Sequence, residues 1–305
     1  MPYRNALREK FRQGKPAVGA FFSNMSANIA EMLAVIGLDF IVVDCEHSPM
    51  GPDSAEQIYR ASQLYNLTTI TRIGQNEQQH ILKYLDAGTD GVQIPLVNTA
   101  QNAHDVIQSV RYPPVGKRGM AGPRLARHGG IPLGEFSRQW NEEGLVCIQI
   151  ETQEAIDNFQ EINSIPGIDI VFFGPTDLSM ALGHPGETSH PEVIATIETL
   201  GKQVIESGKV AGTIVSNLEQ YKRFRGQGFL YCCATAAGFL TKGAQSHLAV
   251  LADYERTFTK TLSGKSISKA DTGTIDLNTL DDIVNEAVTG QGRGDEDEGR
   301  NLFGW

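Results

Sequence analysis

The sequence predicts an α/β fold in which eight strands alternate with helices and close into a (β/α)8 barrel. Apolar runs of strand length recur along the chain, segments with helical spacing separate them, and several runs end in charged side chains. Strands that are buried on both faces read as continuous apolar runs, and alternating strands and helices build parallel sheets. The 305 residues suit a single barrel, since barrels commonly have about 250 residues.

The predicted strands are rich in apolar and β-branched residues, which favour extended structure. They span residues 17–22, 38–44, 67–73, 90–96, 145–151, 168–174, 209–215 and 228–234. An open, doubly wound sheet is the alternative, but no Gly-x-Gly-x-x-Gly follows the first strand.

The predicted helices carry apolar residues on one face. They span residues 27–36, 53–64, 77–87, 99–110, 152–162, 191–206 and 217–226. In the first, Ile29, Met32, Leu33 and Ile36 recur at helical spacing. Asn217 is a predicted N-cap, and glycines follow the predicted helices that end near 87 and 206.

Two regions depart from a minimal barrel. Residues 111–135 form a long connection rich in Pro, Gly and Arg, and such connections are usually functional or disordered. Beyond residue 263 the composition becomes polar, with nine acidic and four basic residues. We therefore expect a catalytic barrel over residues 1–263 and an acidic C-terminal extension over 264–305. The extension should hold one short helix near 277–288 and otherwise be mobile.

Composition excludes several classes of partner. The formal net charge is -10, so neither a nucleic acid nor an anionic membrane is expected to bind. The sequence contains no apolar run long enough to span a membrane and no signal peptide at its N-terminus. We expect a cytoplasmic protein, in which Cys45, Cys147, Cys232 and Cys233 are free thiols.

Acidic residues at the ends of two predicted strands are the first candidate site. Glu151 ends one strand, and Asp177 follows another. Charge is costly beside buried strands, and two carboxylates at one barrel mouth can hold Mg²⁺ or Mn²⁺. Gln149 shares a strand face with Glu151. The alternative is that each acid is a surface carboxylate or a helix cap.

Three further segments add polar groups to the same edge. His47, in the run Asp44-Cys-Glu-His47, can act as a base. Arg72 ends the third strand and can neutralise a developing enolate, although an ion pair with Asp44 or Glu46 is equally compatible. The turn Gly174-Pro175-Thr176 offers backbone N–H groups to a carboxylate, or is a simple capped turn. No lysine stands at the C-terminal end of a predicted strand, which disfavours imine chemistry.

Taken together, these motifs resemble a known family over roughly residues 15–255. The matching pieces are Asp44-Cys-Glu-His47, Arg72, Leu85-Asp86-Ala-Gly88, Ile94-Pro95, Arg111-Tyr-Pro-Pro-x-Gly-x-Arg-Gly119, Gln149-Ile-Glu151, Gly174-Pro-x-Asp-Leu-Ser179 and His190-Pro-Glu192. Their order and spacing resemble the HpcH/HpaI family of class II, metal-dependent pyruvate aldolases. That family includes 4-hydroxy-2-oxoheptanedioate aldolase and 2-dehydro-3-deoxyglucarate aldolase, and macrophomate synthase is a more distant relative.

The resemblance implies a barrel of the phosphoenolpyruvate/pyruvate type and an aldolase that cleaves or forms 4-hydroxy-2-oxo acids through a pyruvate enolate. It implies a divalent cation (Mg²⁺, Mn²⁺ or Co²⁺), held by Glu151 and Asp177, and no organic cofactor. Arg72 would stabilise the enolate oxygen, and Gln149 would support the cation site or the keto group of pyruvate.

The same resemblance assigns the remaining groups. His47 would take the proton of the aldol hydroxyl with Asp86 as its partner, and Asp44 would lie beside them. Gly174, Pro175 and Thr176 would bind the pyruvate carboxylate.

Asp86 lies near the C-terminal end of a predicted helix, which should place it at the opposite end of the barrel from its own chain's site. We expect it either to be structural or to reach a neighbouring subunit, which predicts a homo-oligomer, possibly a hexamer, with sites at subunit interfaces.

Two segments depart from the family pattern, residues 120–127 and the last strand, Gly228-Phe-Leu-Tyr-Cys-Cys-Ala-Thr235. Both should contact the substrate beyond its pyruvate unit, so the acceptor aldehyde stays open. One alternative is an enzyme that decarboxylates oxaloacetate and passes the enolate to a larger electrophile, as macrophomate synthase does. Another is a non-catalytic oligomeric scaffold.

Overall fold

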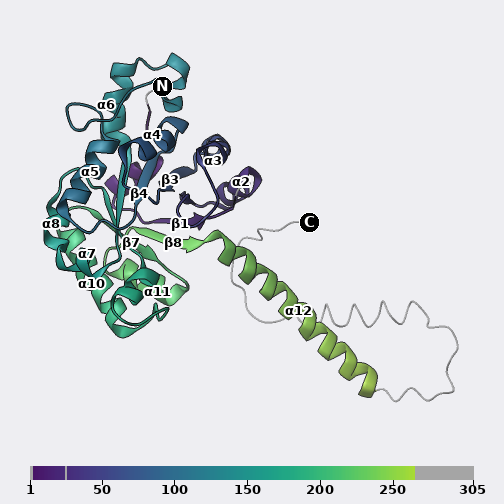
Figure 1. Cartoon of the computed structure of the whole chain (residues 1–305). Helices are drawn as coiled ribbons and strands as arrows, with labels where there is room; N and C mark the ends of the chain where they lie inside the picture. Colours follow the sequence, from purple (N-terminus) through teal and green to yellow (C-terminus); the bar gives the residue numbers. More distant parts are fainter. Residues whose placement is uncertain (1–2, 25, 265–305) are drawn as a thin grey trace. The chain divides into compact units, whose positions relative to one another are not determined.

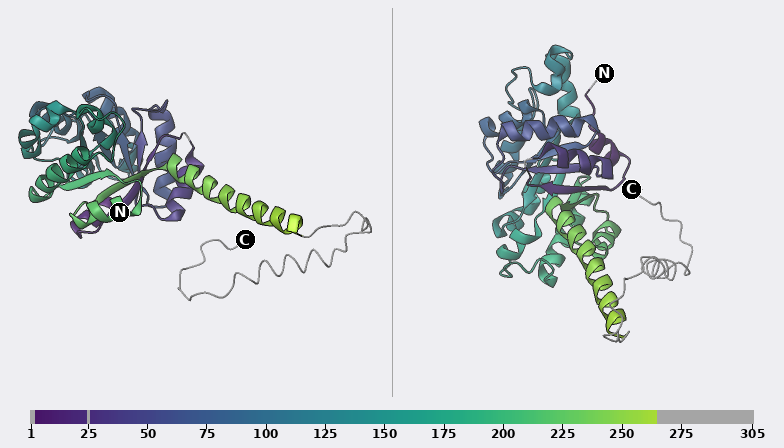
Figure 2. Two further views of the ribbon diagram at one scale, coloured as in Figure 1. Left: turned by 90° about the horizontal axis from the view of Figure 1, so that it is seen from below. Right: turned by 90° about the vertical axis from the view of Figure 1, so that its right-hand side faces the viewer.

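A computed structural model describes residues 3–24 and 26–264, and it confirms the predicted barrel. Eight parallel strands pair in chain order, and β1 closes the sheet against β8, which excludes the open doubly wound sheet. The strands are β1 Ala17–Phe22, β2 Phe40–Asp44, β3 Thr68–Arg72, β4 Gly91–Ile94, β5 Leu145–Ile150, β6 Ile170–Phe173, β7 Val210–Ile214 and β8 Tyr231–Thr235. Figure 1 and Figure 2 show the helices that follow β1 to β7 outside the strands.

Each predicted helix has a counterpart in the structure, and the described residues contain further helices. They are α1 Ala6–Arg12, α2 Ala27–Ile36, α3 Pro52–Leu64, α4 Gln78–Ala87, α5 Ala100–Val110, η1 Arg124–Gly129, α6 Leu133–Glu143, α7 Gln153–Asp157, α8 Phe159–Ser164, α9 Pro175–Ala181, α10 Pro191–Glu206, α11 Leu218–Gly226 and α12 Ala236–Gly264. Asn217 caps α11 by accepting the N–H of Gln220. Gly88 ends α4 with a φ of 106°, a left-handed conformation that favours glycine.

Aromatic rings fill the interior of the barrel below its mouth. Phe40 and Tyr231 stack at 4.3 Å, and Phe172 meets Tyr231 edge-on at 6.1 Å. The strands leave room for these rings at two glycines, since a Cβ on Gly19 would lie 2.5 Å from Phe40 and one on Gly212 would lie 2.6 Å from Tyr231. The barrel is therefore a packed core, and its chemistry must take place at an end.

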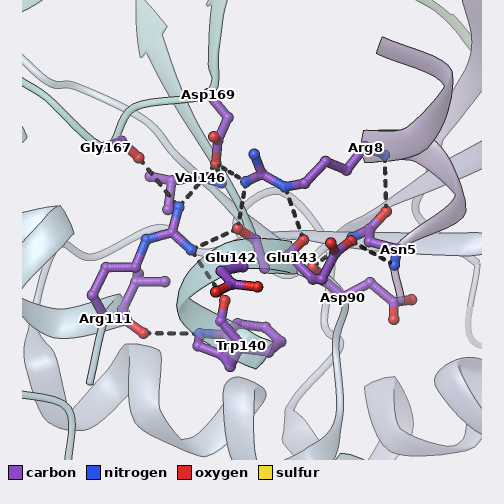
Figure 3. A network of polar contacts seen from close by, with 12 residues as sticks. Asn5, Arg8, Asp90, Arg111, Trp140, Glu142, Glu143, Val146, Gly167 and Asp169 are labelled. Atoms are coloured by element: carbon purple, nitrogen blue, oxygen red, sulfur yellow. Dashed lines mark hydrogen bonds and ion pairs between the residues drawn. The ribbon is translucent and has the colours of Figure 1, made fainter. Parts of the chain in front are cut away.

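The N-terminal ends of the strands are closed by charged groups (Figure 3). Arg8 of α1 and Arg111 both pair with Asp169, at 2.6 and 3.0 Å, and Asp169 also accepts the N–H of Val146. Asn5 donates its side-chain N–H to the carbonyl of Asp90. Such a network at the N-terminal face of a barrel contributes stability rather than catalysis.

The structure corrects several local predictions. Residues 111–135 do not form a disordered connection: they include η1 and lead into α6, which was not predicted. Helices α1 and α12 were also missed, and the helix predicted over 152–162 is divided into α7 and α8. The turn predicted at residues 174–176 opens the short helix α9.

The C-terminal part of the described residues is the long helix α12. The chain separates into two compact units, Met1–Ala244 and Gln245–Trp305, and α12 spans their division. The predicted boundary at residue 263 falls near the end of this helix. The acidic extension and its predicted helix near 277–288 lie outside the described residues. Within the described part of the chain, no helix is both long and apolar enough to cross a membrane.

Candidate active site

A pocket of about 270 Å³ opens at the C-terminal ends of the strands. It is lined by Phe21, Ser23, Asp44, His47, Arg72, Gln149, Phe172, Gly174, Pro175, Thr176, Asp177, Ile214 and Thr235. Eight of these residues were predicted from the sequence to form the site. The pocket thus brings together groups from β2, β3, β5 and α9, which are far apart along the chain.

Arg72 is held by two carboxylates, one at the last residue of β2 and one shortly after it. Its Nε and Nη2 donate to Oδ1 and Oδ2 of Asp44, at 2.9 and 2.7 Å, and its Nε lies 3.3 Å from Oε2 of Glu46. The guanidinium also lies 4.9 Å from the ring centre of Phe21. Arg72 and Asp44 are register partners in β3 and β2, so the strand pairing itself aligns this two-pronged ion pair.

Asp44 organises the start of the loop that carries His47. Its Oδ1 accepts the backbone N–H groups of Glu46 and His47, each at 3.2 Å. Burial alone would raise the pKa of Asp44, but the hydrogen bonds and the charge of Arg72 outweigh it and lower the pKa. The side chain of His47 is 66% exposed and lies 3.8 Å from Glu46, so its imidazole is free to meet a substrate.

Glu46 lies beside the predicted site residues, although the sequence predicted it only as a possible ion-pair partner of Arg72. Its Oε2 is buried and accepts no hydrogen bond in the described structure. Burial raises the pKa of Glu46, against the opposing charges of Arg72 and His47, and Asp44 and Asp177 add to the rise. Residue spacing in the sequence did not assign Glu46 to the site, because its place there depends on the direction of its side chain after β2.

Glu151 is anchored through both of its oxygens. Oε1 accepts the backbone N–H of Leu96 at 2.8 Å, and Oε2 accepts Nε2 of Gln149 at 2.6 Å. Leu96 adopts a φ of +53°, a conformation that is uncommon for a leucine and is often retained at functional sites. Burial raises the pKa of Glu151, and the nearby charges of Asp177 and Glu46 raise it further.

Glu151 and Asp177 converge beside Gly174. A Cβ added to Gly174 would lie 3.3 Å from Oε2 of Glu151 and 3.8 Å from Oδ2 of Asp177. Both carboxylates therefore point toward one small space, and a larger residue at position 174 would occupy it. Glu46, whose buried Oε2 accepts no hydrogen bond among the described residues, adds a third carboxylate. Carboxylate oxygens are the donors that a hard divalent cation prefers.

Two buried glutamines continue from this site into the barrel. Gln149 accepts Nε2 of Gln93 on its Oε1 at 2.6 Å, and Gln93 accepts the hydroxyl of Tyr231 at 3.2 Å. Gln93 was not predicted to belong to the site, and Tyr231 was predicted only as part of a strand that contacts the substrate beyond its pyruvate unit. Their positions in apolar strands indicated core residues, and only the closed barrel brings β4, β5 and β8 together.

Asp86 lies away from the pocket of its own chain. It sits in the last turn of α4, shortly before β4 begins, and it accepts Nη2 of Arg118 at 2.9 Å. Arg118 is 2% exposed and lies over the rings of Tyr112 and Trp140. The structure therefore does not bring Asp86 to His47 within one chain, and its predicted action across a subunit interface stays a prediction.

Other candidate sites are less suited to chemistry. A cavity of about 570 Å³ lies at the N-terminal ends of the strands, beside Asn5 and Asp90, which is the structural face of a barrel. Among the described residues, His184, His190 and Glu192 bring potential metal ligands within 4.8 Å of one another. The two rings stack at 3.4 Å and His184 pairs with Glu192 at 2.8 Å, so these groups already satisfy one another.

The thiols show no sign of nucleophilic activation. Burial raises the pKa of Cys45 to about 12 and raises those of Cys147 and Cys233 well above the usual value. A nucleophilic cysteine requires a depressed pKa. The chemistry of the pocket thus depends on its carboxylates, its guanidinium and its imidazole.

Comparisons with known proteins find similar sequences. Residues 17–245 match the family described as HpcH/HpaI aldolase/citrate lyase. A hydroxypyruvate/pyruvate aldolase of Sagittula stellata is 40% identical over 64% of this chain and 76% of its own length. A 4-hydroxy-2-oxo-heptane-1,7-dioate aldolase of Escherichia coli is 34% identical over 74% of this chain and 87% of its own length.

Solved structures show the same fold. A HpcH/HpaI aldolase/citrate lyase family protein of Burkholderia cenocepacia superposes with a TM-score of 0.77, at 26% identity over 81% of this chain and 99% of its own. Macrophomate synthase, at 19% identity, a TM-score of 0.71 and coverage of 84% of this chain and 91% of its own, shares the fold. By its sequence match and its barrel, the chain belongs to the HpcH/HpaI aldolase/citrate lyase family.

Proposed function

We propose that this protein is a divalent-metal-dependent aldolase that cleaves or forms 4-hydroxy-2-oxo acids, with pyruvate as one partner. The observation that carries the proposal is the convergence of Glu151 and Asp177 beside Gly174, which lines the same pocket as Arg72 and His47. Its relatives are named as aldolases, which favours this function over an oxaloacetate decarboxylase or a non-catalytic scaffold.

The residues fit a divalent cation in number and in type. Glu151 and Asp177 would bind Mg²⁺, Mn²⁺ or Co²⁺ as oxygen ligands, and Glu46 lies close enough for its charge to act on both. A bound cation supplies Lewis-acid polarisation of a substrate carbonyl. No organic cofactor is needed for this chemistry.

Arg72 would stabilise negative charge that develops on the pyruvate oxygen when the enolate forms. Its guanidinium is already oriented by Asp44 and Phe21, so little reorganisation is required at the moment of reaction. Gly174, Pro175 and Thr176 line the same pocket and would bind the carboxylate of pyruvate. Gln149 would support Glu151 through its hydrogen bond.

His47 would hold the proton that moves to or from the aldol hydroxyl. Its exposed imidazole at the rim of the pocket can reach a substrate that stands above the strand ends. Asp44 fixes the loop that carries His47. Asp86 would serve as the partner of His47 from a neighbouring subunit, so we propose a homo-oligomer, possibly a hexamer, with its sites at subunit interfaces.

The test is the exchange of the methyl protons of pyruvate in deuterated water, followed by proton NMR. Protein treated with a chelator would be reconstituted with Mg²⁺, Mn²⁺ or Co²⁺. We expect exchange that requires the metal and is lost in Glu151→Ala and in Arg72→Ala. If no metal supports exchange, with or without an acceptor aldehyde, the pyruvate-aldolase proposal is wrong.

A further inference from the structure

Four polar side chains form one directed row of hydrogen bonds through the barrel. The hydroxyl of Tyr231 donates to Oε1 of Gln93 at 3.2 Å, and Nε2 of Gln93 donates to Oε1 of Gln149 at 2.6 Å. Nε2 of Gln149 donates in turn to Oε2 of Glu151 at 2.6 Å. The row crosses from β8 to β4 and β5, and every donor points toward Glu151.

The negative charge of Glu151 sets this direction. An ionised carboxylate only accepts hydrogen bonds, so Gln149 must turn its NH₂ group toward it and its carbonyl toward Gln93. Gln93 must then present its own NH₂ group to Gln149 and its carbonyl to Tyr231. A reversal of either amide would place like groups against each other in a buried site.

Gln93 lies where burial of a polar side chain has a high desolvation cost. It is 0% exposed, as are Tyr231 and Cys147, and Gln149 is 1% exposed. An unpaired amide in such a core carries a large desolvation cost, whereas aligned hydrogen bonds in a row polarise and strengthen one another. The hydrogen bond from the amide of Gln93 therefore fixes the orientation of the amide of Gln149.

We propose that Gln93 is a positioning residue that acts through Gln149 to hold the carboxylate of Glu151 ready for its cation, with Tyr231 as the outer donor of the row. The N–H of Leu96 holds the other oxygen of Glu151, so the carboxylate is fixed at both atoms. The inference rests on the proposed function in one respect, namely that Glu151 binds the cation.

The experiment measures binding of Mn²⁺ to the full chain by the electron paramagnetic resonance signal of the free ion. In Gln93→Met the side chain keeps its length but loses its donor. We expect its affinity for Mn²⁺ to fall about tenfold or more, as for other residues that orient a metal ligand. Tyr231→Phe should show a smaller loss in the same direction.

The matched control is Tyr59→Phe. The hydroxyl of Tyr59 is also buried and bonds to Thr71 at 2.6 Å, outside the row. Thermal unfolding of each variant shows that binding is measured on folded protein. A role in stability alone would lower the unfolding temperature of Tyr59→Phe and Tyr231→Phe alike and leave Mn²⁺ affinity unchanged in both.

Three outcomes decide the matter. Weaker binding in Gln93→Met and Tyr231→Phe, but not in Tyr59→Phe, supports the proposal. Folded Gln93→Met that binds Mn²⁺ as the wild type does overturns it, while leaving the metal-dependent function intact. A wild-type protein that binds no Mn²⁺, Mg²⁺ or Co²⁺ overturns the metal assignment and this inference with it. If Gln93→Met does not fold, Tyr231→Phe carries the same test.

Discussion

Arg72 forms an ion pair and also lines the pocket. The sequence left two readings of this residue open, a structural ion pair or a group that faces the substrate. In the structure its Nε and Nη2 pair with Asp44 while the residue still lines the pocket. The ion pair thus orients the guanidinium and does not remove it from the site.

The first prediction concerns the shape of the Arg72 guanidinium. Arg72→Lys keeps the charge but loses the fork that matches the two oxygens of Asp44. We expect kcat for pyruvate-dependent aldol cleavage to fall about 10²- to 10³-fold, the loss typical of a removed oxyanion donor. Arg60→Lys, at an exposed pair with Glu56, is the control and should keep its activity. Near wild-type activity of Arg72→Lys would contradict this role.

The second prediction concerns stability and pH. The pKa of Asp44 is lowered in the folded protein, so near its unfolded value of about 3.9 the unfolded chain binds more protons. The stabilisation by Asp44 is therefore complete above that pH and is lost as the pH falls through the folded pKa. We expect Asp44→Asn to lower the unfolding free energy by about 1–3 kcal/mol at pH 7.

Urea unfolding at a series of pH values between 7 and 3.5 measures this effect. The difference between wild type and Asp44→Asn should be constant at neutral pH and should shrink below about pH 4. Asp157→Asn, at an exposed hydrogen bond with Gln153, should show no such trend. A difference that grows as the pH falls would have the wrong sign.

Residue by residue, the sequence was most informative where a side chain stands at a strand end. Asp44, Arg72, Gln149 and Asp177 were predicted from such positions, and all line the pocket. Glu46 and Gln93 were not predicted to belong to the site. Their contacts depend on the direction in which a loop turns and on which strands meet across the barrel. Neither can be predicted from the spacing of residues along the sequence.

At the scale of elements, the strands and most helices follow from periodicity. Residues 17–22, 27–36 and 191–206 were predicted with the bounds that the structure has. Helix α6 was missed because Phe136 and Trp140 are its only fully buried residues, so its apolar face is too sparse to stand out. Helix α9 was missed because Gly174-Pro175 indicates a turn, although proline is well suited to the first helical position.

The third prediction tests how closely α10 approaches the barrel. A Cβ on Gly201 would lie 2.2 Å from the ring of Phe229, which is fully buried. We expect Gly201→Ala to lower the unfolding free energy by about 1–3 kcal/mol through overpacking, despite the better helix propensity of alanine. Chemical denaturation measures the change.

Gly134→Ala is the control for this substitution, because the nearest atom to its added Cβ lies 4.0 Å away. It should be neutral or should stabilise α6 by less than about 1 kcal/mol. If both variants lost stability equally, the close approach of α10 to Phe229 would not explain the result.

At the scale of the whole molecule, the two ends of the barrel carry different groups of polar residues. The C-terminal ends of the strands carry the pocket, whereas the N-terminal ends carry the pairs of Asp169 with Arg8 and Arg111. Asp86 belongs to neither group in its own chain. An aspartate that is held by a buried arginine but stays 29% exposed is well placed to serve another subunit.

The fourth prediction follows from this separation. His47→Ala and Asp86→Ala should each lose aldolase activity, and a refolded mixture of the two should recover part of it, because some interfaces would combine an intact His47 with an intact Asp86. Activity of the mixture against each variant alone measures the recovery. The control is a mixture of His47→Ala with Glu151→Ala. One chain supplies both His47 and Glu151 to a site, so this mixture should recover no activity. Failure of the first mixture to recover would make Asp86 structural.

The closure of the barrel also determines how long β1 stays without its β8 partner during synthesis. Ala17 of β1 pairs with Tyr231 of β8, and Arg8 completes its ion pair only when Asp169 is present. A ribosome adds about 5–20 residues per second, so the first strand waits for seconds with one edge open while the rest of the chain emerges. During this interval the nascent chain exposes apolar β1 to its surroundings, and protection by a chaperone would matter most at this stage.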